Sequence, residues 1–283
     1  MMKMRDIFVL LLAIFFFTGC DPDKWLEGGS EKNREETTLE TEAKPEEIKD
    51  EGKYQKKFYE VRKKDITSLR ADIEIPSGLF RLASTNEVLV DARFSYRKEQ
   101  REPRVNFNQV EDQGQLLVRL PKLEENLKNE RNVTSIKLQE DMPMNLKVTF
   151  GAGKAEFKLE KLNLQRTSFK MGAGEFEVKL PPSIQNLDFD AGVGSASIDL
   201  SGDRTIDLDA ELNCGIGELV ILLPSNVGIK ARIAGLIGGI NARGFTKRGG
   251  SYYNDEWENA KNKIKIEING GIGDIKLKMV NED

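Results

Sequence analysis

A short pattern of alternating apolar and polar residues, interrupted by two glycines, recurs through the second half of the chain. Its clearest copy spans residues 189–198. Apolar residues occupy every second position on both sides of the Gly-x-Gly centre, and the residues between them are mostly charged. This period of two predicts half-buried strands, each with one face in a core and the other in water.

The copies follow one another at a nearly constant interval. Successive copies lie about 20 residues apart, except for the last interval of about 35, which is typical of a solenoid. One copy cannot bury its apolar side alone, so neighbouring copies must stack on it. We therefore predict that residues 141–283 form an all-β, two-sided β-solenoid of about six rungs. We expect two short strands per rung, and rungs stacked parallel, in register and in chain order.

The glycines mark the corner between the two strands of each rung. A corner that needs a positive φ angle, or a close approach of two backbones, favours glycine because any Cβ atom is strained there. The second glycines of the copies are Gly153, Gly174, Gly194, Gly217, Gly238 and Gly273.

Residues 57–140 form a second β-rich region. Residues 69–82 match the columns of the repeat, with Pro76 in the place of the first glycine. We interpret them as a divergent capping rung that protects the open end of the solenoid. Further strands are expected over residues 88–94, 104–110 and 115–120, the last two joined as a hairpin by a turn at Gly114.

The first residues predict export. Residues 1–19 combine a basic start, an apolar run and a small-residue cleavage site, as in a signal peptide. Residues 17–20 resemble the lipobox of bacterial lipoproteins, although Phe17 departs from the usual leucine, and this implies that Cys20 carries a lipid anchor to a membrane. An ordinary secretory signal is the alternative. Residues 20–56 are polar and acidic, which predicts a disordered tether.

The glycine motifs carry a family resemblance over residues 60–280. The series Phe150-Gly-Ala-Gly, Met171-Gly-Ala-Gly, Ala191-Gly-Val-Gly, Cys214-Gly-Ile-Gly and Gly270-Gly-Ile-Gly resembles the bacterial toast-rack family. The resemblance implies an extracytoplasmic β-solenoid related to cell-wall-active antibiotic response proteins and adhesin head domains. It implies no substrate and no catalytic residue.

The amino-acid composition excludes several kinds of catalytic and metal site. The chain contains no histidine, which removes His-based acid–base catalysis and His-containing zinc sites. Of its two cysteines, Cys20 is assigned to lipid and Cys214 to an inert inward position. The formal net charge of −4 provides no reason to expect nucleic acid as a partner. We expect no cofactor and no metal site.

Four outward carboxylates form a candidate acidic patch. Groups on adjacent rungs about 4.8 Å apart could hold a cation or act as a glycosidase pair. Basic residues of the adjoining copies supply the alternative, a set of surface ion pairs without a site. The patch consists of Asp188, Asp190, Asp209 and Glu211, and the expected pairs are Lys170–Asp190, Asp209–Lys230 and Glu211–Arg232.

One copy breaks the alternation, because two large apolar residues stand at its outward positions. An insertion, residues 245–262, follows the next copy and contains Tyr252, Tyr253 and Trp257. We expect the insertion to fold back and cover the apolar pair. A flexible loop, with the pair covered by the N-terminal region or a partner, is the alternative. The residues of this possible docking surface are Val220, Leu222, Tyr252, Tyr253 and Trp257.

Two functional classes remain. The first is a membrane-anchored, extracytoplasmic lipoprotein that acts as a non-catalytic binding or structural module of the cell envelope, with an envelope protein or a glycan as partner. The second is a carbohydrate-active enzyme that uses an acidic groove on the solenoid. The absence of a catalytic signature favours the first.

Overall fold

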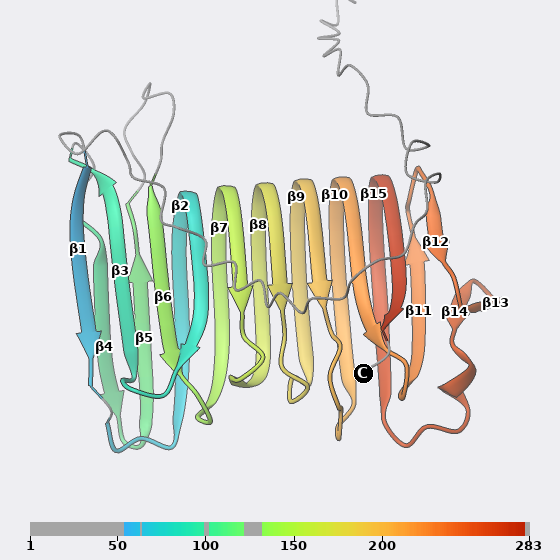
Figure 1. The fold of residues 1–283 in the computed structure, drawn as a ribbon, viewed down its shortest axis with the longest axis horizontal. Helices are drawn as coiled ribbons and strands as arrows, with labels where there is room; N and C mark the ends of the chain where they lie inside the picture. The colour runs from blue at the N-terminus through green and yellow to red at the C-terminus, as the bar shows by residue number, and fades with distance from the viewer. Residues whose placement is uncertain (1–53, 63, 99–101, 122–131, 281–283) are drawn as a thin grey trace, which may run out of the picture. The chain divides into compact units, whose positions relative to one another are not determined.

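The computed structural model describes residues 54–62, 64–98, 102–121 and 132–280. They form one 15-stranded sheet that coils on itself (Figure 1). A single 3₁₀ helix, η2 (Asp255–Trp257), interrupts the described strands. The strands are β1 (Tyr54–Val61), β2 (Ser68–Thr85), β3 (Val90–Arg97), β4 (Arg104–Val110), β5 (Gln113–Arg119), β6 (Val133–Gln139), β7 (Pro143–Lys158), β8 (Asn163–Lys179), β9 (Asn186–Asp199), β10 (Leu208–Pro224), β11 (Gly228–Ala234), β12 (Ile240–Ala242), β13 (Thr246–Arg248), β14 (Ser251–Tyr253) and β15 (Lys263–Val280).

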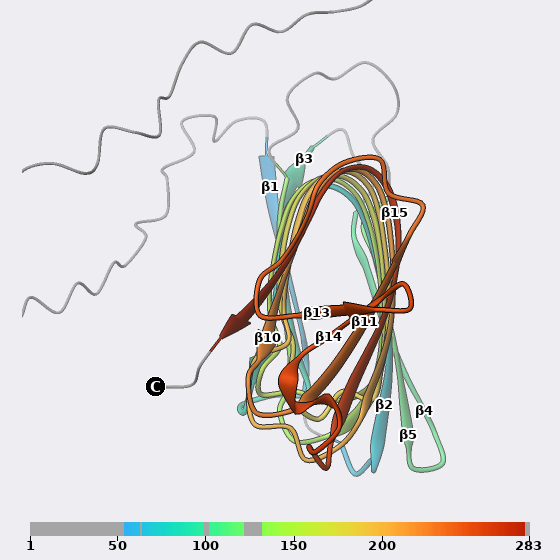
Figure 2. The same cartoon turned by 90° about the vertical axis from the view of Figure 1, so that its right-hand side faces the viewer.

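Most rungs are single long strands bent at the glycines. β2, β7, β8, β9, β10 and β15 each run without a break through the bend, so the expectation of two short strands per rung is wrong for them. We call the part before the glycines the first arm and the part after them the second arm. Figure 2 shows the bends stacked on one side, with the two arms facing each other. The strand continues because neighbouring rungs stay paired in the same register on both sides of the first glycine.

The core fills the space between the two arms. The predicted alternation holds, and each full rung places buried apolar residues on the inner side of both arms. The rings of Phe150, on the first arm of β7, and Phe176, on the second arm of β8, pack edge to face with centroids 6.2 Å apart. A slip of one residue in either arm would move these side chains from the core to the solvent-facing side, so burial determines the register.

The predicted parallel, in-register stack is confirmed, but its order is not the chain order. Gly174 pairs with Gly153 on one side and with Gly194 on the other. However, β15 lies between β10 and the broken rung formed by β11 and β12. β15, the last rung in the chain, therefore lies between β10 and the β11–β12 rung in the stack, although it follows both in the sequence. β15 is long enough to be covered on both sides, whereas β11 and β12 are short and suit the end of the stack.

The N-terminal strands extend the same sheet. β2 is a full rung rather than a cap, because both of its arms have neighbours beyond it. β5 and β4 continue the first arm, and β6, β3 and β1 continue the second. The predicted β4–β5 hairpin is confirmed, but it turns at Glu111 and Asp112, and Gly114 lies within β5.

Glycine is required at the corner for two reasons. Gly194 has φ +132°, a region that side chains with a Cβ rarely adopt. A Cβ atom there would also lie 1.8 Å from the carbonyl oxygen of Gly174 on the next rung. At the first glycine, Gly192, only the second reason applies, since a Cβ would lie 2.4 Å from the oxygen of Gly172. Pro76 takes the place of the first glycine in β2. The neighbouring strand on that side is β5, and β5 pairs with β2 only up to Glu74, so the pairing ends before Pro76.

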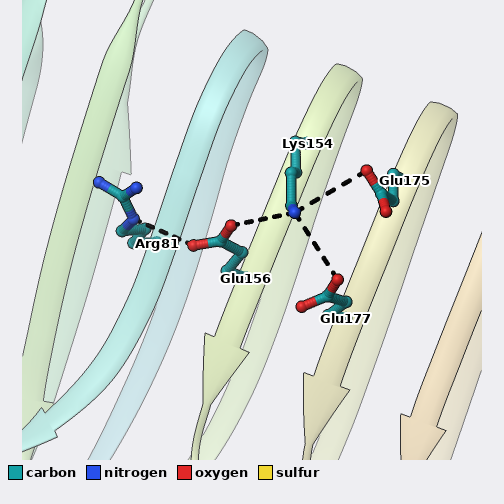
Figure 3. Close-up of polar contacts among 5 residues, drawn as sticks. All are labelled: Arg81, Lys154, Glu156, Glu175 and Glu177. Carbon is teal, nitrogen blue, oxygen red and sulfur yellow. Dashed lines mark hydrogen bonds and ion pairs between the residues drawn. The ribbon is translucent and has the colours of Figure 1, made fainter. Parts of the chain in front are cut away.

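Ion pairs cross the outer face of the second arm (Figure 3). Lys154 lies 3.3 Å from Glu156, 3.8 Å from Glu175 and 3.6 Å from Glu177. Arg81 donates to Glu156 across 3.0 Å. Burial alone would raise the pKa of Glu156, but hydrogen bonds from Arg81 and Lys154 outweigh it and hold that pKa below the ordinary 4.5. The carboxylate therefore stabilises the folded chain in its charged form.

We predict that Gly194→Val strongly destabilises the protein, whereas Ser195→Val leaves its stability almost unchanged. The first substitution adds backbone strain of about 1–3 kcal/mol and a clash with the neighbouring rung. The second changes an exposed side chain on the outer face. Thermal unfolding of the two variants measures the difference, and equal melting temperatures would contradict this view of the corner.

A second prediction concerns Glu156→Gln. Because the folded pKa lies below the unfolded value, the charged group contributes stability above pH 4.5, and this contribution is lost as the pH falls through the folded pKa. The variant should lose up to about 1 kcal/mol at neutral pH and little at about pH 3. Denaturant unfolding at both pH values measures the loss. Glu160→Gln removes a carboxylate at an exposed position and is the control, which should leave the stability at neutral pH almost unchanged.

Candidate binding surface

A row of exposed aliphatic side chains follows the corner of the sheet. The middle residue of each Gly-x-Gly motif points away from the core, and three adjacent rungs place a large β-branched residue there. Ile237, which lies between Leu236 and Gly238, extends the row onto a fourth rung. The exposed fractions are 53% for Val193, 54% for Ile216, 54% for Ile272 and 70% for Ile237. Each is the direct cross-strand neighbour of the next, in the order given. We call these four residues the corner ridge.

The ridge begins partway along the stack. Towards the N-terminal end the same column holds Ala173, Ala152 and Ser77 on β8, β7 and β2. Single exposed apolar residues are common on protein surfaces, but a continuous row of them indicates a contact site. Our sequence reasoning missed this row, because it followed the inward columns. The available signal was the change of the middle residue from alanine to valine and isoleucine.

A shallow groove of about 700 Å³ lies beside the corner on the first arm. Its floor is made of the stacked first glycines and its outer wall of one polar side chain from each strand. In this wall the Asn213 amide donates to Asp190 across 2.8 Å, and the Asn269 amide donates to Asn213 across 2.8 Å. The wall follows β7, β8, β9, β10 and β15 and consists of Thr149, Lys170, Asp190, Asn213 and Asn269. We call it the polar wall.

Cys214 also lines this groove. It is half-buried rather than fully enclosed, as expected for an inward residue close to the bend. Burial, with a smaller effect from Asp190, raises the pKa of its thiol to about 11. The thiol is therefore protonated at neutral pH, and a protonated thiol is a weak nucleophile. The described residues contain no cluster of three or more His, Cys, Asp or Glu side chains arranged to hold a metal ion.

The acidic patch of the sequence analysis lies on the outer face of the first arm. Asp188 and Glu211 are direct cross-strand neighbours on β9 and β10, as the columns predict. Of the four carboxylates only Asp190 reaches the groove. Asp188, Asp209 and Glu211 are exposed on an open sheet face.

Two of the three expected ion pairs of this patch are wrong. Because β15 lies between β10 and β11, Asp209 pairs with Lys265 at 3.8 Å instead of Lys230. Likewise Arg232 pairs with Glu267, at 3.8 Å, instead of Glu211. Lys170 does lie beside Asp190 in register, and Glu211 stands between Asp188 and Glu267.

The expected packing of the aromatic insertion is also wrong. Val220 and Leu222 are half-buried on the outer side of β10, and their neighbours on β15 are Lys276 and Lys278. The insertion lies beyond β15, because its strand β14 pairs with β11. The structure thus separates the two halves of this possible docking surface.

The aromatic residues of the insertion contact one another and nearby cations. The rings of Tyr253 and Trp257 lie 5.6 Å apart in an edge arrangement. The Lys263 ammonium group lies 5.2 Å from the centre of the Trp257 ring, and the Lys247 ammonium group 5.3 Å from that of Tyr252. The insertion covers the edge of β11 through the pairing of β14 with β11, and so it acts as the cap of this end of the sheet.

Cys20 and most of the predicted tether, residues 20–56, lie outside the described residues, which begin at Tyr54. The prediction of a disordered tether is wrong for residues 54–56, because they begin strand β1 and pair with β3. Within the described residues no helix has the length and apolar character needed to span a membrane.

Three solved structures are similar to this chain, and the first of them supports the fold. The crystal structure of a candidate cell adhesion protein from Clostridium sporogenes is similar, with 25% identity and a TM-score of 0.61, over 81% of this chain and 100% of that one. A candidate adhesin from Bacteroides fragilis matches with 10% identity and a TM-score of 0.29, over 80% and 97% of the two chains. One from Parabacteroides distasonis matches with 10% identity and a TM-score of 0.31, over 80% and 98%.

No curated protein matches the chain. Residues 48–184 match the family described as the N-terminal domain of toast_rack, DUF2154. This match covers the N-terminal strands and the first glycine-cornered rungs, and the same corner repeats through β9, β10 and β15. Residues 48–184 therefore carry the N-terminal domain of the toast-rack family, and the repeated corners of the later rungs resemble that family.

Proposed function

We propose that this protein is a lipid-anchored, extracytoplasmic binding module of the cell envelope, adhesin-like and non-catalytic, which docks an envelope protein or glycan on the corner ridge. The observation that carries the proposal is the row of four exposed β-branched residues on adjacent rungs. The similar protein from Clostridium sporogenes, named as a candidate for cell adhesion, supports the adhesin-like role.

The corner is well suited to binding because its backbone is rigid before a partner arrives. Val193, Ile216 and Ile272 each lie between two glycines that are packed on the next rung, and Ile237 precedes one such glycine, Gly238, so little order is gained on binding. The apolar ridge supplies contact area, and the polar wall beside it supplies donors and acceptors that orient a ligand. A central apolar strip with a polar border is the common arrangement of protein binding sites.

The positions of the carboxylates favour binding over the alternative of a carbohydrate-active enzyme. A glycosidase holds the bond to be cleaved between two carboxyl groups in an enclosed site. Here Asp188, Asp209 and Glu211 are exposed on an open face, and only Asp190 lines the groove. The Asp190 carboxylate already accepts a hydrogen bond from Asn213.

Replacing the ridge tests the binding role. In the chain from residue 21, which lacks the lipid-carrying Cys20, the triple variant Val193→Ser, Ile216→Ser and Ile272→Ser should bind isolated envelopes at least about tenfold more weakly, because it removes the central apolar contacts. Co-sedimentation with envelopes measures the affinity. Val110→Ser is the matched control, since Val110 is equally exposed, at 53%, but lies on β4. Equal binding by the ridge variant and the control would reject the proposed site.

A separate experiment tests the anchor. If Cys20 carries lipid, Cys20→Ser should abolish partitioning of the protein into the detergent phase, because acyl chains provide the membrane affinity. It should also leave a precursor that signal peptidase II does not cleave, visible as a larger band. Normal membrane retention of the variant would show that another element anchors the protein.

A further inference from the structure

The second-arm side of the sheet ends in a long open strand. β1 (Tyr54–Val61) is the first strand of the sheet order and, within the described residues, it pairs only with β3 (Figure 1). It is eight residues long and contains neither proline nor a glycine. Such an edge presents backbone N–H and C=O groups that can pair with another strand, and proteins usually shorten, bend or cover it.

The free backbone groups of β1 belong to three alternate residues. The carbonyl of Val61 accepts a hydrogen bond from the Leu89 N–H group, next to the start of β3. Backbone groups of successive residues in a strand point to opposite sides. The N–H and C=O groups of Lys56, Phe58 and Glu60 are therefore directed away from β3, towards the open edge.

The side chains of the same three residues point outward. Lys56, Phe58 and Glu60 are exposed, whereas the residues between them are half-buried against the core. Phe58 is 64% exposed, which is unusual for a large aromatic residue. Neither Lys56 nor Glu60 has an ion-pair partner among the residues that the structure describes. On β3, Glu60 lies opposite another acid, Asp91.

The sequence Lys56-x-Phe58-x-Glu60 is complementary to itself. An antiparallel pair of β1 strands related by a two-fold axis at Phe58 places Phe58 opposite Phe58 of the second copy. The same register places Lys56 opposite Glu60 of the second copy, and Glu60 opposite Lys56 of the second copy. Both charges then gain an opposite partner, and the two exposed aromatic rings cover each other, each a favourable cross-strand contact.

Other two-fold registers of β1 are unfavourable. An axis at Lys57 would place two lysines opposite each other and Phe58 opposite a charged lysine. An axis at Tyr59 would place Phe58 opposite Glu60 and Lys56 opposite Arg62, which has the same charge. Like charges directly opposite each other destabilise a sheet. The register centred on Phe58 is the one that matches both charge and shape.

We propose that two copies of this protein pair through β1 into a head-to-head dimer with one continuous sheet. The interface is isologous, as expected for a two-fold dimer. It uses the end of the stack opposite to the insertion cap, so it leaves the corner ridge of both copies free. The proposal is independent of what the ridge binds.

Cysteine cross-linking in the full-length chain tests the register. Residues of a hydrogen-bonded antiparallel pair have Cα atoms about 5.5 Å apart, within the range of about 4.4–6.8 Å that a disulfide requires. Phe58→Cys should therefore give a disulfide-linked dimer on a non-reducing gel. The unsubstituted chain controls for Cys20 and Cys214, and Val110→Cys controls for exposure. A yield no higher than that of the controls would overturn the proposal.

A mixing experiment keeps the aromatic ring in place. Lys56→Cys and Glu60→Cys should each fail to cross-link alone, because the identical residues of the two copies lie four positions, or about 13 Å, apart along the strands. A mixture of the two variants should cross-link. Cross-linking of either variant alone, or none in the mixture, would reject the register.

Charge exchange provides the third test, read from the cross-linking yield of Phe58→Cys. Lys56→Glu or Glu60→Lys should each weaken the dimer roughly threefold to tenfold, because each creates two repulsive pairs. The double exchange should restore it. Lys158→Glu, the same charge change at an exposed site of β7, should have no effect. Failure of the double exchange to restore pairing would show that Lys56 and Glu60 do not face each other.

Discussion

The fold depends on the close contact of backbone with backbone at the glycine corners. At Gly217, a Cβ atom would lie 1.6 Å from the carbonyl oxygen of Gly194, so no side chain fits between adjacent rungs. This contact lets each strand pass through the bend with the same register before and after it. It also places the two arms face to face, where the apolar columns meet and exclude water. Core, register and corner surface are thus consequences of one steric condition that is met on every full rung.

Most of the stack could be predicted from sequence, because the alternation and the glycine spacing both repeat. Columns such as Val148, Phe169, Phe189 and Leu212 are buried as expected. The order of the last rungs could not be predicted. The columns of β15 match those of β10 and of β11 equally well, so periodicity alone does not distinguish chain order from insertion. The deciding factor is the length of the strands, since only an end position tolerates the short β11 and β12.

The error in order explains the errors at the site. Ion pairs and surface contacts depend on which strand lies next to which, so Asp209 meets Lys265 and the aromatic insertion caps β11 instead of covering Val220. Predictions that depend on one strand alone were more robust. The outward position of Asp188 and the positive φ of Gly194 follow from local pattern and corner geometry. The corner ridge was overlooked although it belongs to this second kind, because the middle residue of the motif was not compared between copies.

At the corner, the residues that stabilise the fold differ from the residue that faces a partner or solvent. Both glycines of the motif are constrained by the neighbouring rung, but the residue between them points outward and touches no core side chain. Ala152 and Ile272 therefore occupy equivalent positions in equally well formed rungs. Since the fold is indifferent to the size of this residue, hydrophobic burial within the chain cannot account for large aliphatic side chains on four adjacent rungs. Their exposure lowers the solubility of the isolated chain and does not stabilise it, and this is the physical reason for our proposal that the ridge contacts a partner.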